Sequence, residues 1–246
     1  MKKLFVLNAI LTSFMMVFMI APMVRADTVT VNRVSGYYSG SGGEFTLFPS
    51  AGLQWVLGSY VEGVTKNIVV GAAPNFQSFC IETDEYVNVP GGPYNVVLNN
   101  SAEAGGSGGP SPDPISKGTA WLYHEFQLGT FQGYDYTQGP PGSGTRNVSA
   151  GKLQEAIWYL EDEITTIGSN PFIDLVTSSS VFGSLSAAKA DNNGTYPVAV
   201  LNLYDDQGGF HQDQLVCVPV PEPATMLLLG SGLLGLAGFV RRKFRK

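Results

Sequence analysis

Two cysteines and one glutamine-containing motif are the parts of this sequence whose residue types suggest covalent chemistry. The 246 residues include only two cysteines, Cys80 and Cys217. In an exported domain, two cysteines by themselves favour a disulfide, here Cys80–Cys217. Such a bridge would tie the domain to the start of a C-terminal stalk, because Cys217 lies three residues before Val220. A thiol-protease pair of Cys80 with His124 has no supporting sequence around either residue.

Cys80 and a distant glutamine each lie in a distinctive motif. The tetrapeptide FCIE spans residues 79–82, and LQEAIW spans residues 153–158 with the glutamine at 154. Together they resemble the two signatures of the thioester domains of bacterial surface adhesins, and similar pairs occur in secreted PEP-CTERM proteins. The resemblance implies an intramolecular thioester between the Cys80 sulfur and the Gln154 side-chain carbonyl, with Phe79, Glu82 and Trp158 around it.

The expected placement of these residues is consistent with such a bond. A thioester forms when a thiolate attacks the carboxamide carbon and ammonia leaves, so the amide must be polarised and water excluded. We expect Gln154 near a helix N-terminus, where free N–H groups stabilise an oxyanion. Trp158, four residues later, lies on the same helix stripe and can cover the bond. On its strand, Cys80 faces away from Phe79 and Ile81 and is free to meet the helix.

The elements that would position these residues are mainly strands. Runs rich in β-branched and aromatic residues, broken by Gly, Pro and Asn, predict strands at 28–34, 45–48, 54–57, 67–70, 76–82, 94–98, 197–204 and 214–218. Helical spacing predicts two inserted helices, 118–128 after Ser116 and 150–164 after Ser149, the second ending in a solvated acidic run at 161–163. The fold class is therefore a β-rich α+β ectodomain over residues 27–218, and the resemblance above implies that it is thioester-domain-like.

The N-terminus has the pattern of an export signal. Residues 1–26 contain two lysines, an apolar run and small residues before a cleavage position between Ala26 and Asp27. This pattern predicts a secretory signal peptide.

The C-terminal segment, residues 219–246, has three parts in order. Val220-Pro221-Glu222-Pro223 precedes an apolar run at 224–240, and a basic tail occupies 241–246. The order resembles a PEP-CTERM sorting domain, which implies a Gram-negative bacterium and processing by an exosortase. We expect a single transmembrane helix at 224–240 with its basic end in the cytoplasm. That helix would anchor the chain in the inner membrane before processing, and the protein would then reach the cell surface or the extracellular space.

The charge distribution excludes one class of partner. All 20 acidic residues and only six of the 14 basic ones lie between Asp27 and Glu222, a formal net charge of −14. Such a surface repels phosphate backbones, so nucleic acid is excluded as a partner. The sequence contains no phosphate-binding loop, dinucleotide fingerprint or HExxH motif. The turns at 191–194 and 205–208 lack the spacing of a calcium loop. We therefore expect no metal, no cofactor and no catalytic residues.

These observations lead to one main interpretation and two alternatives. The protein is expected to attach covalently, through the thioester, to a nucleophile on a surface protein or an exopolysaccharide. This is a single-use reaction without turnover, so the chain is not classed as an enzyme. The alternative is a non-covalent structural or carbohydrate-binding matrix protein with a Cys80–Cys217 disulfide. A hydrolase ranks lowest, because no acid pair can be chosen from the scattered carboxylates.

Overall fold

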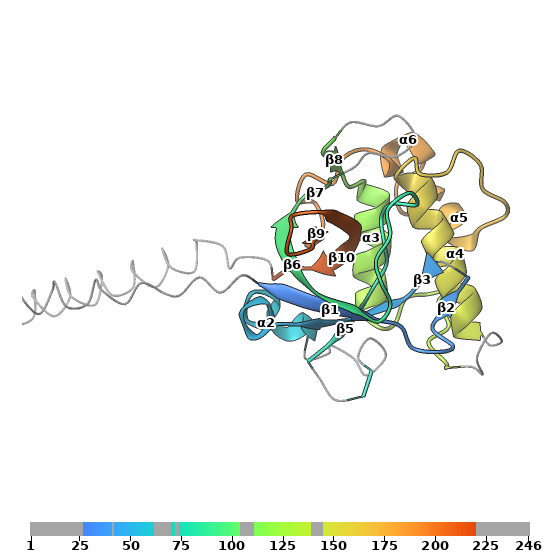
Figure 1. The fold of residues 1–246 in the computed structure, drawn as a ribbon. Coiled ribbons are helices and arrows are strands. Elements are labelled where there is room, and N and C mark those ends of the chain that lie inside the picture. Colours follow the sequence, from blue (N-terminus) through green and yellow to red (C-terminus); the bar gives the residue numbers. More distant parts are fainter. Residues whose placement is uncertain are drawn as a thin grey trace, which may run out of the picture.

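The computed structural model describes residues 27–40, 42–61, 70–71, 74–103, 111–138 and 145–219, and it shows a mixed α+β fold in which helices cover one side of a curled antiparallel sheet (Figure 1). The sheet has six strands in the order β10-β9-β6-β1-β4-β5. Their bounds are β1 Thr28–Asn32, β4 Phe45–Pro49, β5 Phe76–Ser78, β6 Gly91–Asn99, β9 Val198–Tyr204 and β10 Phe210–Cys217. Two short pairs accompany it: β2 Tyr38–Ser39 with β3 Gly42–Gly43, and β7 Ser101–Ala102 with β8 Asp113–Pro114.

The sheet closes on itself through the residues that follow β5. Cys80 bridges Gln214 of β10 in antiparallel fashion. On either side of this bridge, Ile81 donates its backbone N–H to the Asp213 carbonyl at 3.2 Å, and Leu215 donates to the Phe79 carbonyl at 3.0 Å. Cys80 therefore lies in the seam that joins the two outer strands of the sheet.

The inside of the curled sheet is filled by apolar side chains, which we call the inner cluster. Helix α2, Ala51–Leu57, and the 3-10 helix η2, Gly58–Val61, contribute three buried residues at helical spacing to it. The inner cluster consists of Val29, Val31, Phe45, Leu47, Leu53, Leu57, Val61, Phe76, Cys80, Tyr94, Ala199, Leu201, Leu203 and Val216.

The predicted strand at 54–57 is wrong, because these residues belong to α2. Leu53 and Leu57, four residues apart, are buried at 2% and 0% exposure while Trp55 between them is 87% exposed. The Gln54 backbone N–H bonds the Ser50 carbonyl at 2.9 Å, which starts the first turn. The strand was predicted from the aromatic and β-branched residues Trp55 and Val56, but a short apolar run of this kind also fits a helix, and its length does not separate the two.

A second apolar layer, the outer cluster, lies between the sheet and helices α3 (Lys117–Gln127), α4 (Thr145–Leu160), α5 (Pro171–Thr177) and α6 (Leu185–Ala188). The sheet contributes outward-facing side chains, namely Phe79, Ile81, Val198, Val200, Leu215 and Cys217. The prediction of α3 is confirmed, and so is its cap, since the Ser116 side chain accepts a hydrogen bond from the Thr119 N–H at 3.1 Å. The sequence predicted two helices and missed α2, α5 and α6.

Helix α4 starts five residues earlier than predicted and ends four residues sooner. It runs from Thr145 to Leu160, so Ser149 is inside the helix and is not its N-cap. It ends where Asp162 adopts a positive φ of 62°. Leu153, Ile157 and Leu160 form the buried face as expected. The acidic run that follows is not fully solvated, because Glu161 is only 6% exposed.

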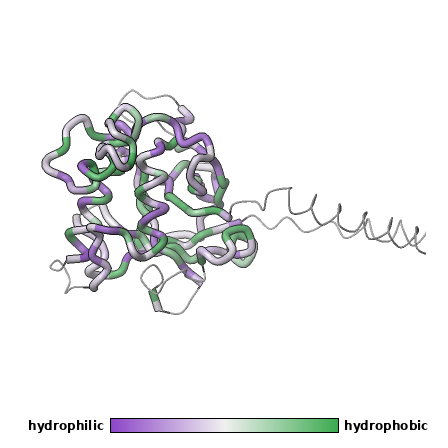
Figure 2. Tube along the Cα trace, turned by 180° about the vertical axis from the view of Figure 1, so that it is seen from behind, coloured by the Kyte–Doolittle hydropathy of each residue, from purple (hydrophilic) through white to green (hydrophobic). Residues whose placement is uncertain are grey.

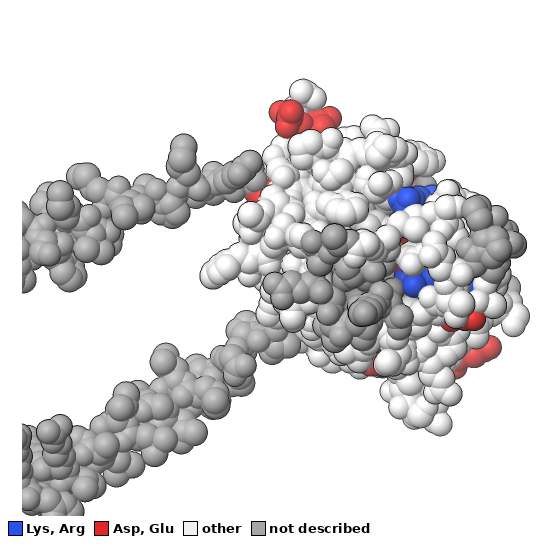
Figure 3. Space-filling view, turned by 90° about the horizontal axis from the view of Figure 1, so that it is seen from below, with Lys and Arg blue, Asp and Glu red and all other residues white. Residues whose placement is uncertain are grey.

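The described chain begins and ends at the same end of the molecule, beside α2. A side chain at Gly52 would meet Asp27, and one at Gly58 would touch Pro219 at 3.5 Å. Figure 1 shows this end on the side opposite α4. In Figure 2, α2 is coloured largely hydrophobic. On the face drawn in Figure 3, the basic side chains lie toward the other end of the molecule.

Several predicted segments lie outside the described residues. These are the signal peptide at 1–26, most of the predicted strand at 67–70, and the sorting motif and apolar run after Pro219. Within the part of the chain that the structure describes, every helix is too short or too polar to span a bilayer.

Candidate functional site

Cys80 and Gln154, which are 74 residues apart in the sequence, contact one another through two hydrogen bonds. The Cys80 Sγ lies 3.3 Å from the Gln154 Oε1, and the Gln154 Nε2 donates to the Cys80 backbone carbonyl at 2.8 Å. Because a carbonyl bond is about 1.2 Å long, the sulfur is within about 4.5 Å of the carboxamide carbon. Attack starts from about 3–3.5 Å, so the contact brings the two atoms near one another, and a further approach precedes bond formation.

Both side chains are completely shielded from solvent, each at 0% exposure. Burial raises the pKa of the Cys80 thiol well above its usual range. The positive charge of Arg33 and the indole N–H of Trp158 lower this pKa, and the Glu82 carboxyl raises it further. The thiol is therefore protonated at neutral pH and serves as the donor to Gln154.

Gln154 does not lie at a helix N-terminus, which corrects the sequence-based placement. It is the tenth residue of α4, nine positions after Thr145. The free N–H groups of the first turn are too far along the axis to act on its side chain, since each residue rises about 1.5 Å. Any polarisation of this amide comes from groups brought in by the fold and not from the helix dipole.

Phe79 and Trp158 lie on different sides of the strand that carries Cys80. Phe79 is in the outer cluster and meets the Phe126 ring edge-on at 5.1 Å. Trp158 packs against the inner cluster, to which Cys80 belongs. The buried indole Nε1 of Trp158 makes no hydrogen bond of normal geometry among the described residues, although its N–H lies near enough to the Cys80 sulfur to lower the pKa of the thiol. The expected alternation of Phe79, Cys80 and Ile81 matches this arrangement, although both faces of the strand are buried.

Glu82 forms a buried acid pair with Asp213 of β10. The Glu82 Oε2 accepts the backbone N–H of Asp213 at 2.9 Å, and Asp213 Oδ2 accepts from the Asn202 amide at 2.6 Å. Burial raises the pKa of both carboxyls, and for Glu82 the Asp213 charge raises it further. Ionisation of both of two adjacent buried carboxyls has a high free-energy cost, so the pair holds a proton at neutral pH.

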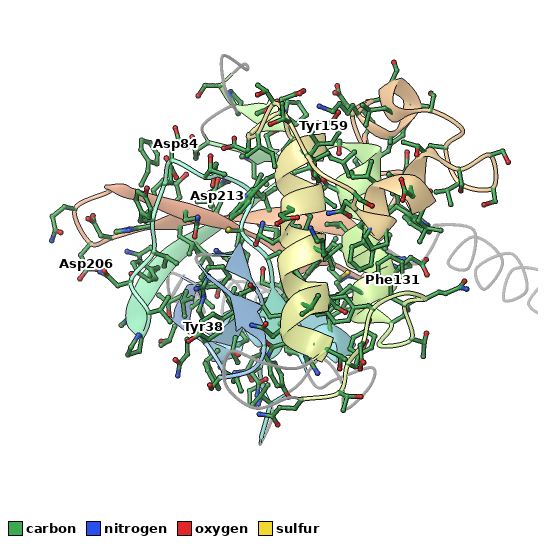
Figure 4. All side chains as sticks on the ribbon, turned by 90° about the vertical axis from the view of Figure 1, so that its right-hand side faces the viewer. Tyr38, Asp84, Phe131, Tyr159, Asp206 and Asp213 are labelled. Atoms are coloured by element: carbon green, nitrogen blue, oxygen red, sulfur yellow. The ribbon has the colours of Figure 1, made fainter. Side chains whose placement is uncertain are left out.

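In the view of Figure 4, Asp213 and Tyr38 lie on one side of α4 and Phe131 on the other.

A buried ion pair fixes the start of α4 against the sheet. Arg146 Nε and Nη2 donate to the two oxygens of Glu44 at 2.7 and 2.8 Å. The Tyr134 hydroxyl also donates to Glu44 at 2.5 Å, and the Arg146 Nη1 donates to the Tyr136 carbonyl at 3.0 Å. The guanidinium stacks on the Tyr37 ring at 3.8 Å. This bidentate geometry is directional, so it sets the register of α4 relative to the sheet.

Gly42 of β3 lets α4 approach closely enough for Gln154 to reach Cys80. A Cβ at this position would lie 2.6 Å from the Gln154 Cγ and 3.0 Å from the Trp158 ring. The absence of a side chain at Gly42 is therefore a condition of the contact.

Sequence reasoning missed two residues beside the Cys80–Gln154 pair. Arg33 follows β1, and its guanidinium lies over the Phe45 ring at 4.1 Å, from where its charge acts on Cys80. Gln214 is buried at 0% directly opposite Cys80, and its Oε1 has no partner among the described residues. No local motif marks either residue, because only strand register brings them to the site.

Both cysteines are free in the structure. The register partner of Cys80 is Gln214, three residues before Cys217 and therefore about 10 Å away along the strand. Cys80 belongs to the inner cluster and Cys217 to the outer cluster, so their side chains point to opposite faces of the sheet. This geometry does not permit the Cys80–Cys217 disulfide without movement of the backbone.

The weaker sequence candidates are placed apart from this site. His124 is on α3, where its ring lies 6.5 Å from that of Tyr196. Asp205 accepts backbone N–H bonds from Gln207 and Gly209, both at 2.8 Å, as in an ordinary turn. Among the described residues, no group of three or more His, Cys, Asp or Glu side chains is arranged to hold a metal ion.

Comparison with known proteins adds one finding, at the C-terminal end. The model of the PEP-CTERM protein-sorting motif matches residues 219–243. The chain carries a PEP-CTERM sorting motif. The predicted motif Val220-Pro221-Glu222-Pro223 lies within the match, and its identification as a sorting signal is confirmed. The motif marks an exported protein that an exosortase recognises. No curated protein and no solved structure matches the chain.

Proposed function

We propose that this exported protein attaches covalently to a partner at the cell surface through an intramolecular thioester between Cys80 and Gln154. The observation that carries the proposal is the contact of these two side chains, 3.3 Å between Sγ and Oε1, at a site with no solvent exposure. A thioester survives in water only if water is kept away, so burial of the pair favours its persistence. The PEP-CTERM motif accounts for delivery to the surface.

Formation of the bond balances without any co-reactant. The Cys80 sulfur attacks the Gln154 carboxamide carbon, the C–S bond forms and the C–N bond breaks. The thiol proton passes to the leaving nitrogen, which departs as ammonia. The Gln154 Nε2 already donates to the Cys80 carbonyl, so the amide is held by its leaving group beside the sulfur.

The attachment step breaks the thioester bond. A nucleophile on a surface protein or exopolysaccharide attacks the Gln154 carbonyl carbon, the C–S bond breaks, and the sulfur takes up the nucleophile's proton. The product is a covalent cross-link and a free Cys80 thiol. Because the protein does not return to its starting state, we do not class it as an enzyme. Before processing, the apolar run at 224–240 holds the chain in the inner membrane, and exosortase action then releases it toward the surface.

Intact mass spectrometry of residues 27–219 under denaturing, non-reducing conditions tests the first step. We expect the wild-type mass to be lower than the sequence mass by one ammonia. Cys80→Ala and Gln154→Ala should each restore the full mass, whereas Cys217→Ala, the matched control, should keep the deficit. A full mass with two free thiols would overturn the proposal. A mass lower by two hydrogens would indicate a disulfide and the non-covalent alternative.

A further inference from the structure

A pocket of about 410 Å³ opens beside the Cys80–Gln154 pair. It lies between α4 and the segment that follows Cys80 in the chain. Its walls include Thr83, Val87 and Val89 from that segment and Trp158 from α4. The attachment reaction proposed above does not assign a role to this pocket.

Two of the lining side chains separate the pocket from the buried pair. Phe45 lines the pocket and belongs to the inner cluster together with Cys80. Trp158 also lines the pocket, packs against the same cluster and follows Gln154 by one helical turn. A molecule in the pocket is therefore one side-chain layer away from the Gln154 carbonyl, and displacement of the Trp158 ring opens the path.

The charge of the lining indicates which nucleophile the pocket takes. Among the described residues that line it, Arg33 is the one charged side chain and no carboxylate is present. The nearby Glu163 carboxylate is engaged by the backbone N–H and the hydroxyl of Thr83, at 2.8 and 2.9 Å. A cation that lines a pocket repels a protonated lysine amine, whereas the net charge of −14 over residues 27–222 repels a polyanion, so a neutral ligand is favoured.

The remaining lining supplies aromatic and aliphatic faces with a few polar groups. Trp158 and Phe45 provide flat apolar surfaces, and Thr83 and Gln212 provide hydrogen-bonding groups. Pockets that combine apolar walls with a few placed polar groups bind small polar molecules in a fixed orientation. A sugar ring has this combination of apolar faces and hydroxyl edges.

We propose, on the basis of the thioester reaction above, that this pocket binds a sugar unit of a neutral saccharide and that a sugar hydroxyl is the acceptor. The hydroxyl oxygen attacks the Gln154 carbonyl carbon and forms an ester. The C–S bond breaks, and the hydroxyl proton passes to the Cys80 sulfur, which leaves as a thiol. The positive charge of Arg33 favours the negative charge that develops on sulfur during the step.

Intact mass spectrometry of acceptor adducts tests the choice of nucleophile. Purified residues 27–219 that show the ammonia deficit are incubated with equal concentrations of an oligogalacturonate, a neutral oligoglucoside and a lysine-containing peptide. We expect the neutral oligoglucoside to add at least tenfold faster than the lysine peptide and the oligogalacturonate, and alkaline hydroxylamine to remove the adduct as it does an ester. Faster addition of the lysine peptide, or an adduct that resists hydroxylamine as an amide does, would overturn the proposal.

Matched variants locate the site of binding. Val89→Trp fills the pocket at a residue that is 38% exposed, and we expect saccharide addition to fall at least tenfold. Val97→Trp, on β6 at 51% exposure and outside the pocket lining, should leave the rate unchanged. Equal rates in the two variants would refute the assignment of the pocket.

Calorimetry on the Cys80→Ala variant separates saccharide binding from the bond itself. This variant cannot form a thioester, yet the pocket lining is intact, so the neutral oligoglucoside should bind and Val89→Trp should abolish the binding. If the wild-type protein shows no ammonia deficit, the thioester reaction fails while the pocket is still tested by this measurement. If the deficit is present but Cys80→Ala binds no saccharide, the thioester stands and the acceptor proposal fails.

Discussion

Two buried polar contacts between helix α4 and the sheet differ in how completely their polar atoms are hydrogen-bonded. At Glu44–Arg146, both carboxylate oxygens and the guanidinium make short charge-assisted hydrogen bonds, supported by Tyr134 and Tyr136. At Cys80–Gln154, two neutral groups make one long hydrogen bond that involves the sulfur and one hydrogen bond from the Gln154 amide to the Cys80 backbone carbonyl. The side-chain oxygen of Gln214, opposite Cys80, has no partner among the described residues. The first contact holds the helix in place, and the second keeps reactive groups together without binding them strongly.

The difference shows how the fold can separate positioning from chemistry. A bidentate ion pair is directional and strong enough to fix the register of a helix. A buried thiol and carboxamide gain little from each other, so their contact depends on the ion pair, on Gly42 and on the apolar face of α4. Three changes test this division, in order of decreasing effect.

The largest effect is expected when one partner of the ion pair is removed. Glu44→Gln leaves the Arg146 charge buried without its counter-ion, which typically costs about 3–5 kcal/mol in the free energy of unfolding. Urea denaturation measures the loss, and mass spectrometry shows whether the ammonia deficit falls with it. The double variant Glu44→Gln/Arg146→Met should recover much of the stability. A single variant as stable as the wild type would show that this pair does not hold α4.

A third contact at the far end of α4 should respond to pH. Glu161 accepts hydrogen bonds from the backbone N–H and hydroxyl of Ser116, and burial raises its pKa to about 7. Because the folded state prefers the protonated acid, Glu161 makes its full contribution to the free energy of unfolding below pH 4. This contribution is lost as the pH rises through 7. The loss amounts to about 3 kcal/mol, and other buried acids whose pKa is raised, such as Glu82, act in the same direction.

Urea denaturation between pH 4 and 8 checks this expectation. Glu161→Gln should flatten the dependence of the unfolding free energy on pH, while Glu155→Gln on the half-exposed face of α4 should not. An unchanged slope in Glu161→Gln would contradict the assigned origin of the effect.

The smallest effect on stability is expected at Gly42, where β3 approaches the Gln154 side chain of α4 closely. Gly42→Ala places a Cβ 2.6 Å from the Gln154 Cγ, and such overpacking typically costs about 1–3 kcal/mol. The displaced Gln154 should also reduce the fraction of molecules with the ammonia deficit. Gly168→Ala, where a Cβ meets no atom within 4 Å, is the control. A full deficit in Gly42→Ala would show that the approach of α4 tolerates a methyl group.

Much of the local structure could be predicted from the sequence, whereas the helix ends and the site could not. Strand β5 and the cap at Ser116 follow from residue types and spacing over a few residues, but β5 ends at Ser78 and not at residue 82 as predicted, and Cys80 forms an isolated bridge beyond it. The start of α4 was placed too late because its first turn is stabilised by Arg146, whose partner Glu44 lies about 100 residues earlier. Helix α2 was taken as a strand because four residues do not distinguish the two periods.

The sequence by itself determined the C-terminal sorting motif, the acidity of residues 27–222, and the Cys80 and Gln154 motifs, since each is a property of residue type and order along the chain. Only the tertiary structure decided that Cys80 lies in the seam of a closed sheet, that Arg33 and Gln214 are its neighbours, and that Cys217 faces away. The physical reason is that strand register and helix docking are set by contacts between residues far apart in the chain, where a shift of one residue reverses which face each side chain occupies.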